Sequence, residues 1–508
     1  MPTITKQDNT ATVVFDSPDS RTAFYTLIKD FLTGTGEYAN TTATKLLVTV
    51  KGRNPTVASQ PDFGTGTDAD PYVYFKFDTP ASTTRKATVV IDWSGINLTI
   101  NYSTGLMADK VFTFMMHDLA AVSSIHHINL NIANNSKKGQ TCYVSGAGSV
   151  TFENSAIYGG VTVEGDNYAA FVHNGTGTVQ FLNTKVEGEV CSKPVLNTGT
   201  GTISFNNSAV RCKGESGHAI QNLSTGTIEA VNTEIAYYKA NRGVYNKAGG
   251  EIALTGCTFV EDTDVDYYQG QSVYNESGLV NLEGCTILAV TNQDRAELCN
   301  CRIKGGFENE SYARLTHCGL SDTFYAKSGR AFFDNCRIFI SEARSNFIAG
   351  IYVESAEASV HLSNSDIEVY NQGGSATAGA YGIFIYNMSN AVNYRDIYAQ
   401  NCVITAGRAS NSTAKSIGIT DFNNFASSNY IRITLLGCKF PEPNWGVLGD
   451  NVSVGFPDEE TTPRHPVMHV QGCKFSKAGI AIGSQYYTES TQATTYLPTG
   501  ANLFNVVL

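Results

Sequence analysis

Charged residues and proline are both scarce in this chain of 508 residues. Asp, Glu, Lys and Arg make up 16% of it, and there are 13 Pro against 47 Gly, 26 Tyr and 26 Phe. An average globular protein is roughly 25% charged, and disordered chains depend on charge and proline, so this composition excludes a disordered chain. The abundance of aromatic residues and glycine instead favours a protein made mainly of β-strands.

Long apolar runs are also missing. No stretch approaches the ~20 apolar residues of a membrane-spanning helix, and the residues after Met1 lack the apolar centre of a signal peptide. The 46 acidic residues outnumber the 35 basic ones, for a net charge of -11, which repels nucleic-acid phosphates and anionic lipids. We therefore expect no nucleic-acid partner, no membrane span, and export, where it occurs, by a route that needs no such leader.

One eight-residue pattern recurs from about residue 150 and is called the repeat phrase below. It has apolar residues at positions 1, 3 and 8, usually Asn or Gly at position 5, and Cys, Ser or Thr at position 6. Thirteen copies have their sixth positions at Ser155, Thr184, Ser208, Thr233, Cys257, Cys285, Cys301, Cys318, Cys336, Ser365, Cys402, Cys438 and Cys473. Their spacing of 16 to 37 residues fits one coil of a solenoid per copy.

Each repeat phrase has the period-2 pattern of a strand, then a bend, then a second short strand. The Asn at position 5 tolerates a left-handed bend. Stacked Asn side chains, about 4.8 Å apart in neighbouring coils, can also hydrogen-bond to one another. A second phrase ending in Asn often precedes the first, at Asn174, Asn197, Asn222, Asn246, Asn275 and Asn309. Those coils therefore contain at least two strand-turn units.

The stacked apolar positions, the recurrent Asn and the coil spacing resemble the right-handed parallel β-helix of the pectate-lyase-like superfamily, over roughly residues 45–480. The resemblance implies an all-β solenoid with a capping helix. We expect an N-terminal arm and cap at 1–44, a β-helix at 45–484 and a tail at 485–508. Coils are expected to be irregular to about 149 and regular from 150 to 480.

The cap is predicted at residues 20–33, where Phe24, Leu27, Ile28 and Phe31 have helical spacing. An open β-helix end exposes unpaired strand edges, and a helix laid over the first coil would close it. A docking helix for a partner is the alternative.

The cysteines share the sixth position with Ser and Thr, which predicts a buried, reduced column chosen for small volume. Disulfides between coils are the less favoured alternative, because parallel side chains in one column suit the required dihedral poorly. A zinc site at Cys299, Cys301, His317 and Cys318 is disfavoured, since Cys299 has the phase of an exposed position. We therefore predict no metal site there.

Enzymes of the superfamily imply a row of carboxylates on one outer face, in some cases with calcium. The chain has Asn364-Ser365-Asp366, Gly217-His218-Ala219 and Arg302-Ile303-Lys304, but their order differs from that of polygalacturonases and the paired Asp is missing. The catalytic candidates are Asp264, Asp366 and Asp396, and calcium at the acidic run around Asp264 is the one cofactor considered. A solvated acidic loop is the alternative.

Aromatic residues between the core phrases are candidates for glycan binding, because a sugar ring can stack on an exposed aromatic face. We select Tyr267, Tyr268, Tyr386 and Tyr394. Aromatic stacks between coils are the alternative interpretation.

The repetitive architecture, the low charge and the missing leader resemble bacteriophage virion proteins of the tailspike or head-fibre kind. The resemblance implies a homotrimer in a virion or outside the cell, with its N-terminal region facing other virion proteins and a cell-surface polysaccharide as ligand. Two alternatives stay open: a polysaccharide lyase or glycoside hydrolase, and a structural decoration protein without a ligand.

Overall fold

The computed structural model divides the chain into two compact units, unit 1 (Met1–Asn281) and unit 2 (Leu282–Leu508). It describes residues 4–7, 10–15, 21–51, 63–67, 71–94, 96–100, 110–135, 139–159, 169–188, 193–213, 218–238, 242–262, 271–355, 357–374, 378–386, 395–408, 416–422, 431–441, 445–448, 467–475, 480–482 and 485–487.

Unit 1 consists of three sheets, A, B and C, to which each coil contributes one strand in turn. Sheet A contains β1 (Ile4–Gln7), β2 (Thr10–Phe15), β3 (Lys45–Val50), β5 (Ala87–Asp92), β8 (Ser123–Ile128), β11 (Ser149–Glu153), β14 (Thr178–Leu182), β17 (Thr202–Asn206), β20 (Thr227–Val231) and β23 (Glu251–Thr255). Sheet B contains β6 (Asn97–Ile100), β9 (Asn131–Asn134), β12 (Ala156–Gly159), β15 (Lys185–Gly188), β18 (Ala209–Cys212), β21 (Glu234–Tyr238) and β24 (Thr258–Asp262). Sheet C contains β4 (Tyr72–Asp78), β7 (Phe112–Leu119), β10 (Gly139–Gly146), β13 (Ala169–His173), β16 (Lys193–Asn197), β19 (Ile220–Asn222), β22 (Arg242–Asn246) and β25 (Gln271–Asn275).

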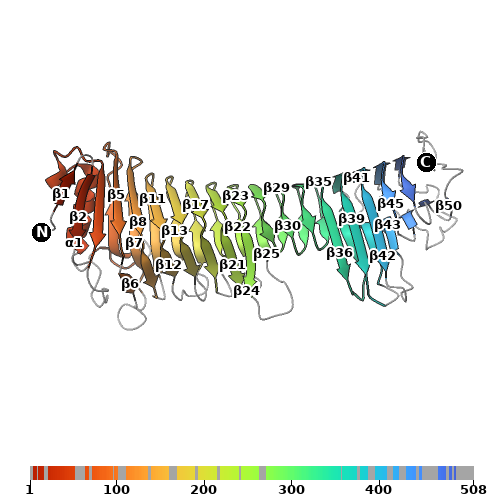
Figure 1. Ribbon diagram of the computed structural model, residues 1–508, viewed down its shortest axis with the longest axis horizontal. Helices are drawn as coiled ribbons and strands as arrows, with labels where there is room; N and C mark the ends of the chain where they lie inside the picture. Colours follow the sequence, from red (N-terminus) through yellow and green to blue (C-terminus); the bar gives the residue numbers. More distant parts are fainter. Residues whose placement is uncertain are drawn as a thin grey trace. The chain divides into compact units, whose positions relative to one another are not determined.

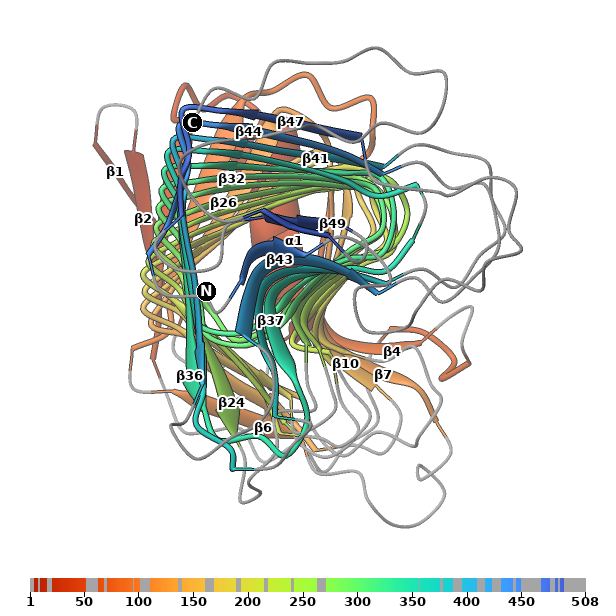
Figure 2. The same cartoon turned by 90° about the vertical axis from the view of Figure 1, so that its right-hand side faces the viewer.

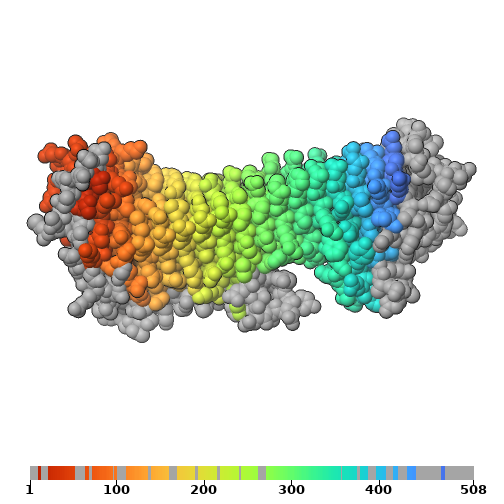
Figure 3. Space-filling model, viewed as in Figure 1, coloured from red at the N-terminus to blue at the C-terminus, as the bar shows by residue number. Residues whose placement is uncertain are grey.

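Neighbouring coils of unit 1 pair in parallel and without a shift in register along the repeat phrases, for example Phe152 with Phe181 and Phe181 with Phe205. Successive strands of sheet A lie side by side from β5 through β8 and β11 to β17 (Figure 1). On the face that the space-filling view presents, no opening separates successive coils of this unit (Figure 3). Unit 1 is therefore a parallel β-helix, as predicted.

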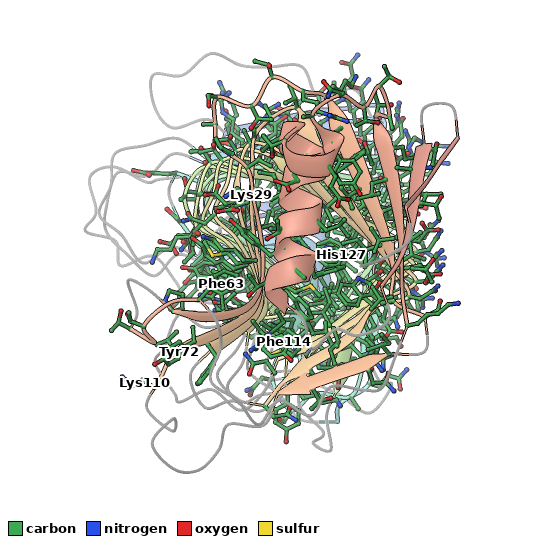
Figure 4. The ribbon with its side chains drawn as sticks, turned by 90° about the vertical axis from the view of Figure 1, so that its left-hand side faces the viewer. Lys29, Phe63, Tyr72, Lys110, Phe114 and His127 are labelled. Carbon is green, nitrogen blue, oxygen red and sulfur yellow. The ribbon has the colours of Figure 1, made fainter. Side chains whose placement is uncertain are left out.

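The N-terminal end of unit 1 is covered by α1 (Arg21–Thr33), which confirms the predicted capping helix (Figure 4). Phe24, Ile28 and Phe31 are buried, and the Phe24 ring packs edge-on against Phe75 and Trp93 at centroid distances of 5.9 and 5.8 Å. A short 3₁₀ helix, η1 (Gly36–Tyr38), follows. β2 pairs in parallel with β3, and β1 pairs antiparallel with β2. Sheet A therefore begins before the helix, which the sequence pattern did not indicate.

Unit 2 repeats the three-sheet arrangement, and β26 (Leu279–Glu283) contains the division between the units. Its part of sheet A contains β29 (Arg295–Cys299), β32 (Tyr312–Thr316), β35 (Arg330–Asp334), β38 (Ser359–Ser363), β41 (Arg395–Gln400), β44 (Ile431–Leu436) and β47 (Val467–Gln471). Its part of sheet B contains β27 (Thr286–Ile287), β30 (Arg302–Ile303), β33 (Gly319–Leu320), β36 (Arg337–Glu342), β39 (Asp366–Asn371), β42 (Val403–Arg408), β45 (Lys439–Phe440) and β48 (Lys474–Phe475). Its part of sheet C contains β28 (Val290–Asn292), β31 (Phe307–Asn309), β34 (Phe324–Ala326), β37 (Ile348–Val353), β40 (Ala380–Tyr386), β43 (Ser416–Phe422), β46 (Trp445–Leu448), β49 (Ile480–Ile482) and β50 (Gln485–Tyr487).

Within unit 2, β36, β37 and β41 lie on three different sides of the coil (Figure 2). The strand pairings between its coils are parallel, and β50, at the start of the predicted tail, pairs antiparallel with β49. Unit 2 is therefore also an all-β parallel β-helix.

The bend of the repeat phrase is left-handed in all thirteen copies. The fifth position has a φ between 48° and 65°, whether it is Asn, Gly or, once, His317. Asn and Gly tolerate this conformation best, which explains their recurrence. Exposed Asn side chains bond across coils in some copies, as Asn183 does to Asn154 at 3.3 Å. The predicted ladder is therefore present in part.

A longer Asn ladder lies inside unit 1, at the Asn of the second phrase. Asn197 donates to Asn222 at 2.9 Å, Asn222 to Asn246 at 3.0 Å and Asn246 to Asn275 at 3.0 Å, and each residue is fully buried. Asn222 and Asn246 each donate to a backbone carbonyl as well, so the ladder satisfies buried polar groups of the turn.

The cysteine column is buried and its thiols are free, as predicted. The exposed fractions of Cys257, Cys285, Cys301, Cys318, Cys336, Cys402, Cys438 and Cys473 are 5% or less. Cys299, which has the opposite phase, is partly exposed. Each column thiol lies near carbonyl oxygens, as Cys318 does to those of Leu298 at 3.5 Å and Thr316 at 3.4 Å. The column therefore accommodates a small hydrogen-bond donor as well as a small volume.

Candidate functional site: an aromatic groove on sheet A of unit 2

The outward side of sheet A follows from the repeat phrase. Positions 1 and 3 point into the core, so positions 2 and 4 point to solvent. In β32, β35, β38 and β41 the second position is occupied by Arg314, Phe332, His361 and Tyr398, which pair in register from strand to strand. The solenoid thus aligns a cation and three aromatic rings in one outward column.

The rings of this column stack on one another and form an aromatic wall. Phe332 and His361 have centroids 5.0 Å apart with planes 24° apart, and His361 and Tyr398 are 5.9 Å apart at 29°. Tyr312, from the neighbouring outward column, lies 5.6 Å from Phe332. The Tyr398 hydroxyl donates to Gln400 Oε1 at 3.0 Å, which fixes its ring orientation. All these side chains remain partly exposed.

A polar wall stands beside the aromatic one, at the fourth position of the same phrases. Asp334 on β35 and Ser363 on β38 are in register, and Ser363 Oγ donates to Asp334 Oδ1 at 2.7 Å. This bond leaves the second carboxylate oxygen of Asp334 and a hydroxyl lone pair of Ser363 as acceptors.

The two walls enclose a groove of about 430 Å³, which is called the aromatic groove below. Its lining consists of Tyr312, Arg314, Leu315, Phe332, Phe333, Asp334, His361, Leu362, Ser363 and Tyr398. Small-molecule sites commonly measure about 300–1,000 Å³ and combine apolar surface with a few polar groups. The groove has the size and the mixed lining of a small-molecule site.

His361 contributes a neutral ring to the aromatic wall at pH 7. Burial lowers the pKa of His361 from its ordinary value of 6.5 and outweighs the opposite effect of Asp396, while Arg330 and Arg432 lower it further. A neutral imidazole stacks on its aromatic neighbours without the cost of burying a charge.

Two of the three predicted catalytic aspartates, Asp366 and Asp396, lie in the described part of the chain. Asp396 lies on β41 of sheet A and forms a two-pronged ion pair with Arg432, at 2.6 and 2.8 Å. Asp366 is exposed at the start of β39 in sheet B, in register with Arg337. Asp264 lies outside the described residues. The grouping of these three carboxylates in one site therefore stays untested as a whole, and Asp366 and Asp396 belong to different sheets.

Asp334, the carboxylate in the groove, does not form a catalytic carboxylate pair with Asp396. The two lie two coils and four residue positions apart in sheet A. At about 4.8 Å per coil and 3.3 Å per residue, their separation is about 16 Å. Glycoside hydrolases hold their two carboxyl groups about 5–10 Å apart. The two aspartates do not have the spacing of such a pair.

Among the predicted glycan-binding tyrosines, Tyr386 joins a second aromatic cluster, on sheet C of unit 2. Its ring lies 6.0 Å from that of Tyr352 and 6.4 Å from that of Phe384, and Phe347 stacks on Phe384 at 4.8 Å. Phe347 is 41% exposed. Tyr267, Tyr268 and Tyr394 lie outside the described residues, so their role stays a prediction.

No group of three or more His, Cys, Asp or Glu suited to a metal ion occurs in the part of the chain that the structure describes. The calcium hypothesis centres on Asp264, outside that part, and stays a prediction. No α-helix within the described ranges has the length and apolarity needed to cross a membrane.

Comparison with protein-family models, curated proteins and solved structures finds no match to this chain.

The aromatic residues of the groove lie within the repeat phrases and not between them, where the glycan-binding tyrosines are predicted. Their signal is nevertheless in the sequence. The second position of the phrase is Thr151, Gln180, Ser204 and Glu229 in early copies and becomes Phe332, His361 and Tyr398 in later ones.

Proposed function

We propose that the protein is a glycan-binding β-helix that serves as a structural and attachment protein of a virus particle, similar to tailspikes and fibres. The single observation that supports glycan binding best is the aromatic groove, with stacked rings on one side and Asp334 and Ser363 on the other. Aromatic rings present apolar surface to the C–H groups of a sugar, and the polar wall offers acceptors to its hydroxyls.

The virion part of the proposal rests on architecture and composition. A repetitive parallel β-helix with 16% charged residues and aromatic-rich coils resembles fibres and spikes. Its ligand would then be a cell-surface polysaccharide, and its N-terminal region would face other virion proteins.

The glycan proposal is tested by screening the full chain against an array of bacterial and plant polysaccharides and measuring the affinity of a hit by calorimetry. We expect Tyr398→Ala to weaken that affinity about 2- to 13-fold, because stacking on one aromatic ring contributes on the order of 0.5–1.5 kcal/mol. The matched control is Gln180→Ala, which truncates an exposed side chain at the same phrase position in unit 1.

Three outcomes contradict the proposal in different ways. If Gln180→Ala and Tyr398→Ala weakened the glycan affinity equally, the binding site would lie elsewhere. If no polysaccharide of the array bound, a decoration protein without a ligand would be favoured. Release of new reducing or unsaturated ends from a bound glycan would establish the enzyme alternative.

The fibre part is tested separately, by light scattering of the purified chain. We expect a mass near three times 54.7 kDa. A monomer at all concentrations measured would argue against a trimeric spike without affecting the glycan proposal.

A further inference from the structure

Three basic side chains occupy equivalent positions on successive coils, at the start of the sheet C strands in unit 1. Lys193 begins β16, His218 lies just before β19, and Arg242 begins β22. The Arg242 guanidinium stacks over Tyr274 at 3.6 Å and Tyr245 at 4.4 Å, and the His218 ring meets Tyr245 edge-on at 5.1 Å. The tyrosines thus hold two of the three groups in fixed positions.

Within the described residues, neither Lys193 nor Arg242 forms an ion pair. The carboxylate at the edge of the cluster, Glu276, accepts a hydrogen bond from the Tyr245 hydroxyl. His218 Nδ1 is buried and has no hydrogen-bond partner.

Two other lysines of unit 1 do form ion pairs. Lys185 and Lys213 both form ion pairs with the buried carboxylate of Glu187. Partly buried cations are normally paired in this way, since burial without a partner is costly. Among the described residues, the lack of an ion-paired carboxylate at Lys193 and Arg242 is therefore a feature of this cluster and not of unit 1 as a whole.

The local field at the cluster is positive. Burial lowers the pKa of Lys193, and it lowers the pKa of His218 to about 4, with the charges of Arg242 and Lys193 adding to the effect. His218 is therefore neutral at pH 7 and stands between two cations. Any anion that enters would relieve the repulsion among the three groups.

We propose that Lys193, His218 and Arg242 form an anion-binding site that takes a carboxylate or sulfate group of a ligand. Coils spaced by about 4.8 Å place an anion above His218 within reach of the cations on both neighbouring coils. His218 adds a third donor, and protonation allows both of its ring nitrogens to donate. The site lies in unit 1 and does not depend on the aromatic groove.

The test is an NMR titration of the histidine side chains in the full chain, with His218 assigned by the signal that disappears in His218→Gln. The probes are sodium sulfate and sodium acetate, each compared with sodium chloride at equal ionic strength. We expect sulfate to raise the pKa of His218 by about one unit more than chloride does, because the bound anion favours the protonated ring.

Variants then assign the effect to the cluster. Lys193→Gln and Arg242→Gln are each expected to raise the sulfate concentration at half-saturation at least about 5-fold, corresponding to one lost charge-assisted bond. Lys247→Gln, which removes an exposed lysine just after β22, is expected to leave it unchanged. Circular dichroism checks that each variant keeps the β-helix.

Equal shifts in sulfate, acetate and chloride would mean an ionic-strength effect only, and would overturn the proposal. The proposal would also be overturned if Lys193→Gln, Arg242→Gln and the parent chain had the same sulfate concentration at half-saturation. A larger response to acetate than to sulfate would retain the site and assign it to carboxylates. Loss of glycan binding in Tyr398→Ala with unchanged sulfate binding would show that the two sites are separate.

Discussion

The second position of the repeat phrase carries different side chains in the two units, although the backbone is the same. In unit 1 the register column is Thr151, Gln180, Ser204, Glu229 and Ala253. In unit 2 the equivalent column contains Arg314, Phe332, His361 and Tyr398. Small or flexible polar side chains are enough to build this face, so the fold does not require the aromatic wall.

The inward third position, by contrast, holds large apolar side chains in both units. They are Phe152, Phe181 and Phe205 in unit 1 and Leu315, Phe333 and Leu362 in unit 2, and each is at most 1% exposed. Inward positions therefore specify the coil, while the fold leaves the outward positions unconstrained. The aromatic side chains of the groove are not needed for folding, which agrees with the ligand-binding role proposed for them.

The largest effect is expected from truncating an inward residue. Phe181 is fully buried and stacks between Phe152 at 5.4 Å and Phe205 at 4.7 Å. We expect Phe181→Ala to lower the free energy of unfolding by about 3–5 kcal/mol, as large-to-small changes in a packed core do. Its exposed neighbour serves as control, since Gln180→Ala should cost less than about 0.5 kcal/mol. Urea unfolding measures both, and similar costs would contradict the division between inward and outward positions.

A second contrast between the two units concerns how stability depends on low pH. The inward column of unit 1 includes His127, which is stacked on Phe152 at 5.2 Å and accepts a hydrogen bond from Trp93 Nε1 at 3.0 Å. Its other nitrogen lies 2.8 Å from His117 Nε2. Protonating His127 would place a new N–H against that of Trp93. Burial lowers the pKa of His127 well below 6.5 and that of His117 to about 3.

The sign of the pH effect follows from those depressed pKa values. The unfolded chain binds protons at these histidines below about pH 6.5 while the folded chain does not, so stability falls as the pH falls from about 6.5 toward 3. The slope reaches about 1.4 kcal/mol per pH unit for each histidine. We expect His127→Gln to reduce it, as measured by urea unfolding followed by the fluorescence of the buried Trp93.

His361→Gln is the matched variant in unit 2, because His361 is only partly buried. It should change that slope much less. A larger effect at His361 than at His127 would contradict the role assigned to burial.

Most of the coil could be predicted from the sequence, because its constraints are local and repeated. Alternating apolar residues fix the strands, and the left-handed bend selects Asn or Gly at position 5, as at Asn154 and Gly256. The helix was visible from the spacing of Phe24, Ile28 and Phe31.

The remainder depends on contacts between residues far apart in the chain. The pairing of β2 with β3 spans the helix and has no local signal. The buried ladder through Asn197 and Asn222 requires knowing that these side chains face inward. The groove requires knowing that Phe332, His361 and Tyr398 share a column, although 66 residues separate the first from the last.

The smallest effect is expected at the sixth position, where the geometry is shared but the residue is mostly Ser or Thr in unit 1 and mostly Cys in unit 2. Thr184 in unit 1 lies 3.0 Å from the carbonyl oxygen of Phe152, on the preceding coil, and 2.9 Å from that of Leu182. Cys318 in unit 2 has the equivalent partners, Leu298 and Thr316, at 3.5 and 3.4 Å. A hydroxyl and a thiol therefore occupy the same place and donate to the same kinds of acceptor.

We expect Cys318→Ser to change the free energy of unfolding by less than about 1 kcal/mol, because the stronger hydroxyl bond offsets the lost sulfur contacts. Cys318→Val has no donor and adds a branch, so it should destabilise by about 1–3 kcal/mol. Urea unfolding compares the two variants with the parent chain. If Ser proved as costly as Val, the column of unit 2 would depend on sulfur itself, and the equivalence of the sixth positions in the two units would be wrong.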